Sequence, residues 1–149
     1  MTGIQAVLLP VGTDIYAVPM DWVKEVVAAP PPTRLVTAPL LVLGLFNLRG
    51  QIVPLLDTAM LLGLTCHEPA TFALVLQSRD GPVGLVATAF PHRGVLGPSI
   101  GSSELPGTSG TYLWQGQVAV LLDPDVLLTS EQLGRSDIRD KPVPTGVSR

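Results

Sequence analysis

The sequence predicts an all-β protein, a barrel or a sandwich, in which the helices are few and short. Fifteen glycines and fifteen prolines are spread through the 149 residues and divide the chain into short segments. Most of these segments are rich in valine, leucine, isoleucine and threonine, and none shows the period of a long amphipathic helix. Short apolar runs between turn residues are typical of strands in sandwiches and barrels.

Nine segments have the composition of strands. In chain order they are Ile4–Leu9, Ile15–Val18, Lys24–Ala28, Val42–Asn47, Ile52–Leu56, Phe72–Gln77, Val83–Thr88, Thr111–Trp114 and Val118–Leu122. Turn residues at Gly12–Asp14 and Arg79–Pro82 predict hairpins, whereas Ser99–Ser109 is interpreted as a glycine- and serine-rich loop. Val42–Phe46 is apolar throughout apart from its glycine, which predicts burial on both faces of a sheet.

An internal repeat relates the two parts of the chain. Leu48–Asp57 and Trp114–Asp123 align without a gap, since both contain a Gly-Gln turn and both end in Leu-Leu-Asp. A short apolar segment follows each copy and predicts a helix, at Thr58–Leu62 and Pro124–Leu128. Two copies are too few for a solenoid. The repeat therefore predicts two small β-units, residues 1–64 and 70–133, in one domain spanning 1–133. The polar, aperiodic residues 134–149 predict a flexible tail.

Composition favours a protein-binding role and disfavours nucleic acids and membranes. Charged residues make up 14% of the chain, below the ~25% of typical soluble domains. The net charge of -3 and the pI near 5.2 argue against a nucleic-acid partner. The most apolar stretch, Leu35–Leu48, is interrupted by Pro39 and is shorter than the ~20 residues of a spanning helix. Cys66 is the single cysteine, so the cytoplasm is the expected compartment.

The aspartates that end the two repeat copies have two interpretations. Leu55–Ala59 resembles the Asp-Thr-Gly/Ala signature of dimeric aspartic proteases, whose paired carboxylates share a proton. Alternatively, Asp57 caps the following helix by accepting a backbone N–H. Asp123 occupies the equivalent position and precedes Pro124, and proline is preferred at the first position of a helix. Because a cap explains both aspartates, we expect them to be structural and expect no catalytic residue.

No other pattern predicts a metal, nucleotide or nucleophilic centre. Cys66, His67 and Glu68 are adjacent, and adjacent side chains do not converge easily on one ion. His92 has no serine or cysteine partner in a recognisable nucleophile motif, and the chain contains no glycine-rich phosphate-binding motif. We therefore expect neither a metal nor another cofactor.

Arg49 is the one ionisable residue between Arg34 and Asp57. Its guanidinium must reach a carboxylate, backbone carbonyls, a partner or water, because an unpaired buried charge is costly. The second repeat copy has Gln115 at the equivalent position, so the turn does not require an arginine. This comparison favours recognition as the role of Arg49, with a turn arginine that points into water as the alternative.

Three ordered segments resemble the CheW-type coupling proteins. Leu43–Asp57 resembles the family hallmark, G-x-x-N-L-R-G-x-x-x-P-x-x-D. Upstream, Tyr16–Val26 resembles the pattern Y-A-L-P-x-x-x-V-x-E-V, and downstream Val118–Leu128 resembles the closing strand and helix. The resemblance covers nearly the whole chain, from Ile4 to Leu133.

The resemblance implies two small five-stranded SH3-like β-barrels packed around a shared core. It also implies a non-catalytic scaffold in a bacterial chemosensory pathway, which couples the cytoplasmic tip of chemoreceptors to the regulatory domain of a CheA-type histidine kinase. By the same resemblance, Asn47, Arg49 and Gly50 lie at a receptor-binding groove with Glu25 and Val26 nearby. An alternative within the binding class is an inhibitor that occupies the kinase without bridging to a receptor.

Overall fold

The computed structural model of the protein describes residues 3–31, 33 and 36–129, so the predicted tail at 134–149 lies outside the described residues. Strands dominate this part of the chain. The strands are β1 (Gln5–Val11), β2 (Asp14–Pro19), β3 (Val23–Ala28), β4 (Val42–Leu48), β5 (Gln51–Leu56), β6 (Phe72–Ser78), β7 (Gly81–Ala87), β8 (His92–Val95), β9 (Ser99–Gly101), β10 (Thr108–Trp114) and β11 (Gln117–Leu122). The short helices are the 3-10 helix η1 (Met20–Trp22) and the α-helices α1 (Thr58–Leu61) and α2 (Pro124–Leu127).

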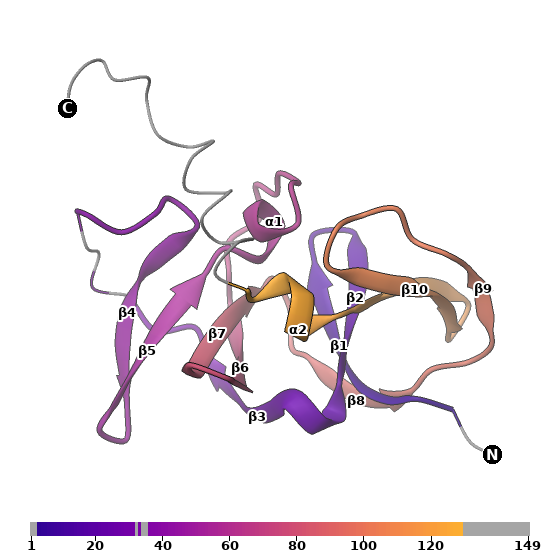
Figure 1. The fold of residues 1–149 in the computed structure, drawn as a ribbon, viewed down its shortest axis with the longest axis horizontal. Helices are drawn as coiled ribbons and strands as arrows, with labels where there is room; N and C mark the ends of the chain where they lie inside the picture. The colour runs from indigo at the N-terminus through magenta and orange to yellow at the C-terminus, as the bar shows by residue number, and fades with distance from the viewer. Residues whose placement is uncertain (1–2, 32, 34–35, 130–149) are drawn as a thin grey trace.

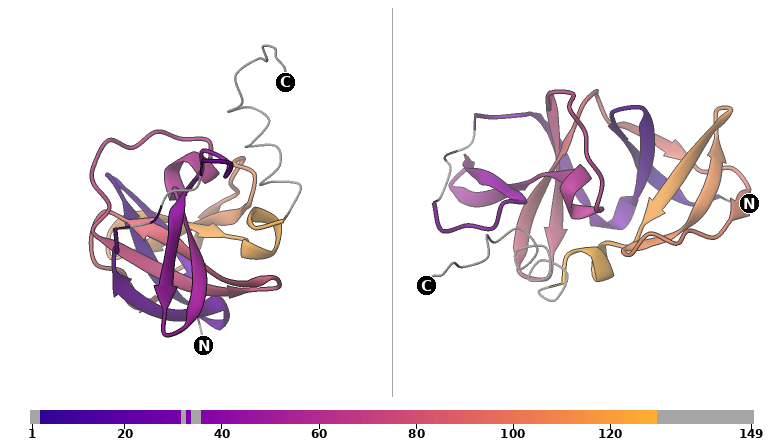
Figure 2. Two further views of the ribbon diagram at one scale, coloured as in Figure 1. Left: turned by 90° about the vertical axis from the view of Figure 1, so that its left-hand side faces the viewer. Right: turned by 90° about the horizontal axis from the view of Figure 1, so that it is seen from above.

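The strands form two sheets that lie side by side along the long axis of the molecule (Figures 1 and 2). The first sheet has the order β8-β1-β2-β11-β10-β9 and the second has the order β3-β6-β7-β5-β4. Neighbouring strands are antiparallel except for the parallel pairs β2–β11 and β5–β7. The mainly-β prediction is confirmed, although the first sheet has six strands instead of the expected five.

In each sheet, the two outermost strands are consecutive in the chain, so the sheet curls towards closure. In the first sheet, the segment between β8 and β9 bonds to β10: the N–H of Gly97 donates to the carbonyl of Leu113 at 2.7 Å, and the N–H of Leu113 donates to the carbonyl of Pro98 at 3.0 Å. In the second sheet, the segment between β3 and β4 bonds to β4 through Thr33 and Leu45, which exchange two backbone hydrogen bonds.

The sheets do not follow the division of the chain into residues 1–64 and 70–133. The hairpin β1–β2 lies in the first sheet beside β11, and the hairpin β6–β7 lies in the second sheet beside β5. Each repeat therefore contributes its opening hairpin to one sheet and its closing hairpin, β4–β5 or β10–β11, to the other. Because neither sheet is complete without strands from the other half, the two halves hold each other together.

The largest apolar cluster in the described residues lies between the two sheets. It combines buried side chains from β1 and β2, from β5, β6 and β7, and from both α-helices. Smaller clusters fill the inside of each sheet. Along β1, Val7 and Leu9 pack in the shared core, whereas Ala6 and Leu8 pack inside the first sheet. β1 is thus buried on both faces. In β4, for which the sequence predicts burial on both faces, Phe46 is buried, whereas Val42, Leu43 and Leu45 are half-buried.

Two strands, β8 and β9, are not predicted by the sequence patterns. β8 contains a histidine, an arginine and a glycine, and β9 has three residues that are all exposed. Neither strand buries a full apolar face, so neither produces the alternation that identifies a strand. The interpretation of Ser99–Ser109 as a loop is consequently wrong at both ends, where β9 and β10 lie.

The two α-helices begin at the predicted positions, but their first turns are bonded differently. In α1, the N–H of Met60 donates to Oδ1 of Asp57 at 3.1 Å, so Asp57 caps the helix. In α2, the equivalent N–H of Val126 donates to the main-chain carbonyl of Asp123 at 3.1 Å. The carboxylate of Asp123 makes no capping hydrogen bond. This corrects the expectation that both aspartates cap through their side chains.

This difference predicts unequal effects of two matched substitutions. Asp57→Ala is expected to lower the free energy of unfolding by about 1 kcal/mol, because it removes a side-chain cap. Asp123→Ala is expected to change it by less than about 0.5 kcal/mol, as for surface positions without a specific contact. Urea denaturation of the two variants measures both values, and equal losses would contradict the assignment.

Candidate functional site

The turn between β4 and β5 consists of Arg49 and Gly50. Leu48 and Gln51 form the last strand pair, so the loop has two residues. Both central residues have a positive φ, 50° and 90°, which is the signature of a type I′ hairpin turn. The N–H of Gly50 donates to Oδ1 of Asn47 at 2.8 Å. Asn47 therefore stabilises the turn from within its own hairpin.

The hairpin of the second repeat copy has the same turn with a neutral residue. Gln115 and Gly116 have φ values of 47° and 77°, and the flanking pair is Trp114 with Gln117. Residues with side chains rarely adopt this left-handed conformation because their Cβ crowds the backbone. The backbone thus tolerates glutamine as well as arginine, and the turn does not depend on the charge of Arg49.

The Arg49 side chain forms an ion pair with Glu25 of β3, on the opposite edge of the second sheet. The hydrogen bond and the negative charge of Glu25 raise the pKa of the Arg49 guanidinium. The Arg49 side chain is nevertheless 69% exposed, whereas that of Glu25 is 24% exposed. Because solvent screens such a pair, its contribution to stability is small. The Arg49 side chain is paired with Glu25 and is still exposed to solvent.

A second polar contact lies next to the ion pair. Nζ of Lys24 donates to Oε1 of Gln51 at 3.1 Å, again between β3 and the β4–β5 hairpin. We call the surface formed by Lys24, Glu25, Asn47, Arg49, Gly50 and Gln51 the seam, because it spans the two edges of the second sheet. The sequence analysis did not include Lys24 and Gln51 among the site residues. The one feature of the sequence that could have indicated them is that Lys24 precedes Glu25 and Gln51 follows Gly50.

The structure brings together four of the five residues that the family resemblance implies. Val26 is the exception, because successive residues of a strand point to opposite faces. Glu25 pairs with Val75, which packs inside the second sheet, and Val26 pairs with Leu74, which packs in the shared core. Val26 is itself half-buried against the shared core. Its side chain therefore does not share a face with the ion pair.

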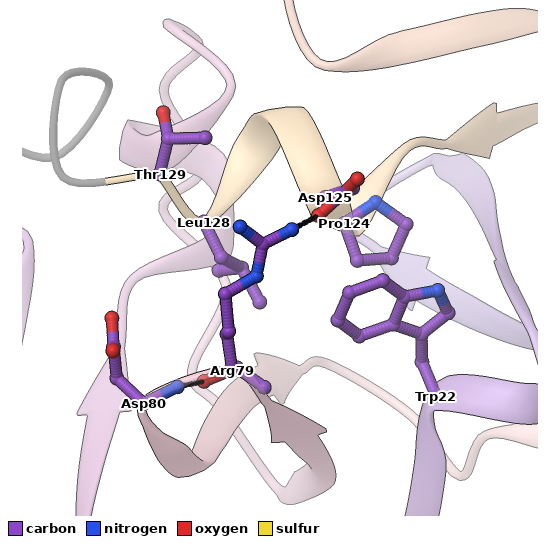
Figure 3. A pocket seen from close by; sticks show the side chains of 8 residues that line it. Trp22, Arg79, Asp80, Pro124, Asp125, Leu128 and Thr129 are labelled. Carbon is purple, nitrogen blue, oxygen red and sulfur yellow. Dashed lines mark hydrogen bonds and ion pairs between the residues drawn. The ribbon is translucent and has the colours of Figure 1, made fainter.

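A separate pocket of about 400 Å³ lies where the two sheets meet, and no residue of the seam lines it (Figure 3). Its walls are Trp22, the turn between β6 and β7, and α2 with the two residues that follow it. Arg79 extends across it to Asp125, with 2.8 Å between Nη2 and Oδ1. Both of these side chains are more than half exposed. The ion pair therefore links the sheets at the surface and builds no buried polar centre.

The described residues offer neither a metal centre nor a spanning helix. Across residues 3–31, 33 and 36–129, no three or more histidine, cysteine, aspartate or glutamate side chains are grouped so that they could hold a metal ion. In the same part of the chain, no helix is long and apolar enough to cross a membrane.

Comparison with known proteins decides the family. Residues 5–132 match the family model of the CheW-like domain. The chain belongs to the CheW-like domain family. Chemotaxis protein CheW of Rhizobium meliloti (strain 1021) is 28% identical over 140 residues, covering 87% of this chain and 90% of that protein. A probable chemotaxis protein CheW of Rhizobium etli is 32% identical over 81 residues, covering 53% of this chain and 52% of that protein.

The fold of this CheW-like domain is also similar to a solved structure. The scaffolding protein TtCheW from Thermoanaerobacter tengcongensis superposes with a TM-score of 0.74 at 16% sequence identity, covering 88% of this chain and 96% of that one. The family match and the relatives named as chemotaxis proteins give no support to a protease. The protease interpretation of Asp57 is therefore set aside, which agrees with its capping bond to Met60.

Proposed function

We propose that this protein is a cytoplasmic, non-catalytic scaffold that couples chemoreceptors to a CheA-type histidine kinase. The observation that carries this proposal is the match of residues 5–132 to the CheW-like domain. It is supported by relatives named as chemotaxis proteins and by a structural neighbour named as a scaffolding protein. The low share of charged residues, 14%, agrees with a protein that has much of its surface covered by partners.

The seam is the proposed receptor-binding site. It presents an exposed guanidinium on a turn whose backbone does not need one. Glu25 fixes the direction of that guanidinium, and Asn47 and Gly50 fix the turn that carries it. A receptor tip is a helical hairpin, and helices dock through apolar contacts, with charged residues choosing the partner and its register. In this proposal Val26 supports the site from the shared core.

A scaffold must bind two partners at once. All residues of the seam belong to the second sheet or its hairpin turn, so a receptor docked there leaves the surface of the first sheet accessible. The proposal assigns the regulatory domain of the kinase to a surface separate from the seam. Binding of the kinase domain should then not depend on Arg49.

Size-exclusion chromatography of the full chain with the regulatory domain of a CheA-type kinase tests the kinase half of the proposal. We expect co-elution for the wild-type protein and, to the same extent, for Arg49→Gln. Equal co-elution is expected because the kinase domain is proposed to bind a surface that does not include Arg49. Failure of the wild-type protein to bind the kinase domain would contradict the proposed function.

A further inference from the structure

Strand β3 contains a β-bulge at Lys24. Val23 pairs with Leu76 and Glu25 pairs with Val75, so β3 has one extra residue between two adjacent positions of β6. A bulge of this kind changes the direction of the extra side chain and is frequent beside functional sites.

The bulge has a clear cause in the packing. Val23 and Val26 both pack against the shared core, although residues three apart in a regular strand point to opposite faces. The extra residue restores the shared face for the two valines. It leaves Lys24 exposed at the seam.

The charge of Lys24 is not compensated within the described part of the chain. Its ammonium donates to the neutral amide of Gln51, and no described carboxylate lies within ion-pair distance of it. Arg49, by contrast, is paired with Glu25. The described residues contain four lysines and arginines against nine aspartates and glutamates. Lys24 is therefore an uncompensated cation in an acidic domain, beside the residues proposed to bind the receptor.

We propose that Lys24 is a specificity-determining residue that pairs with a carboxylate of the receptor tip, so that the docked receptor surface is acidic at the seam. This inference rests on the proposed function. The hydrogen bond to Gln51 holds the flexible lysine side chain across the seam, on the residue that follows the Arg49–Gly50 turn. A fixed, unpaired cation attracts an acidic partner and disfavours a basic one, because like charges in contact are costly. Binding should therefore weaken as salt screens this attraction.

The test uses the full chain and a soluble helical-hairpin fragment of a chemoreceptor tip, with dissociation constants measured at low and high salt. At low salt we expect Lys24→Glu to weaken binding about 10-fold or more and Lys24→Gln about 3-fold. Both variants should depend less on salt than the wild type. The matched control is Arg93→Glu, an exposed cation on β8 of the other sheet, which has no ion pair among the described residues and should change binding less than about 2-fold.

A receptor fragment with its acidic residues changed to amides tests whether receptor carboxylates cause the effect of Lys24. With this fragment, wild type and Lys24→Glu are expected to bind equally. If wild-type protein binds the original fragment and Lys24→Glu binds it equally well, the role of Lys24 is overturned and the scaffold function stands. If the difference between them persists with the neutralised fragment, the carboxylate pairing is overturned. If wild-type protein does not bind the original fragment, the receptor half of the proposed function is itself overturned.

Discussion

Replacing Arg49 with glutamate is expected to abolish coupling to the receptor while the protein stays folded. The substitution removes the exposed guanidinium and places a second carboxylate opposite Glu25. The new carboxylate would repel Glu25 within the seam and would also repel an acidic receptor surface. We therefore expect the affinity for the receptor tip to fall about 100-fold or more. The measurement is the dissociation constant for the receptor tip, together with receptor-dependent activation of the kinase.

The fold should tolerate this change because the second hairpin forms the same turn with Gln115. Arg49→Gln reproduces that residue in the first hairpin and serves as the matched control for charge. We expect both variants to keep the circular dichroism spectrum of the wild type, and Arg49→Gln to bind the receptor more weakly than wild type but better than Arg49→Glu. Loss of the folded spectrum in Arg49→Gln would show that the arginine is structural and that the assignment of the site is wrong.

The largest loss of stability is expected from Leu74→Ala. Leu74 lies on β6 in the shared core, has no exposed surface and pairs with Val26 and Leu85. Removing a fully buried leucine side chain costs about 2–5 kcal/mol, because burial is lost and a cavity remains. This is a large fraction of the ~5–15 kcal/mol by which domains are stable. Urea denaturation measures the change, and Ile52→Ala, at a position that is 58% exposed, is the control.

The same experiment tests how the two halves are joined. Because the repeats exchange their opening hairpins and share the core around Leu74, we expect a single cooperative transition for the wild type and for Leu74→Ala. Two separate transitions, of which only one responds to the substitution, would contradict the shared core.

The sequence predicts those features of the fold that depend on local patterns. Apolar runs identify the nine longer strands, and turn residues identify the hairpins, because burial and backbone conformation act on neighbouring residues. Features that depend on distant pairing are missed. The exchange of hairpins follows from the pairing of β2 with β11, which are about 100 residues apart in the chain and carry no local signal.

The candidate site shows the same limit more sharply. The repeat shows that the turn does not require an arginine, since Gln115 occupies the position equivalent to Arg49 in the second copy. The partner of that arginine, Glu25, is 24 residues away and becomes evident when the second sheet brings its two edges together. The faces that Glu25 and Val26 occupy, and the bulge at Lys24, depend on the register of β3 against β6. One residue of register decides which face a side chain occupies.

The central claim is that this protein bridges two partners, and a three-component binding experiment tests it most directly. The full chain, a receptor tip fragment and a CheA-type kinase regulatory domain are mixed and separated by size-exclusion chromatography with light scattering. The scaffold account predicts a single species that contains all three, and loss of the receptor component alone when Arg49→Glu replaces wild type. A complex of the protein with the kinase domain that excludes the receptor would contradict the account and would support an inhibitor that occupies the kinase without bridging.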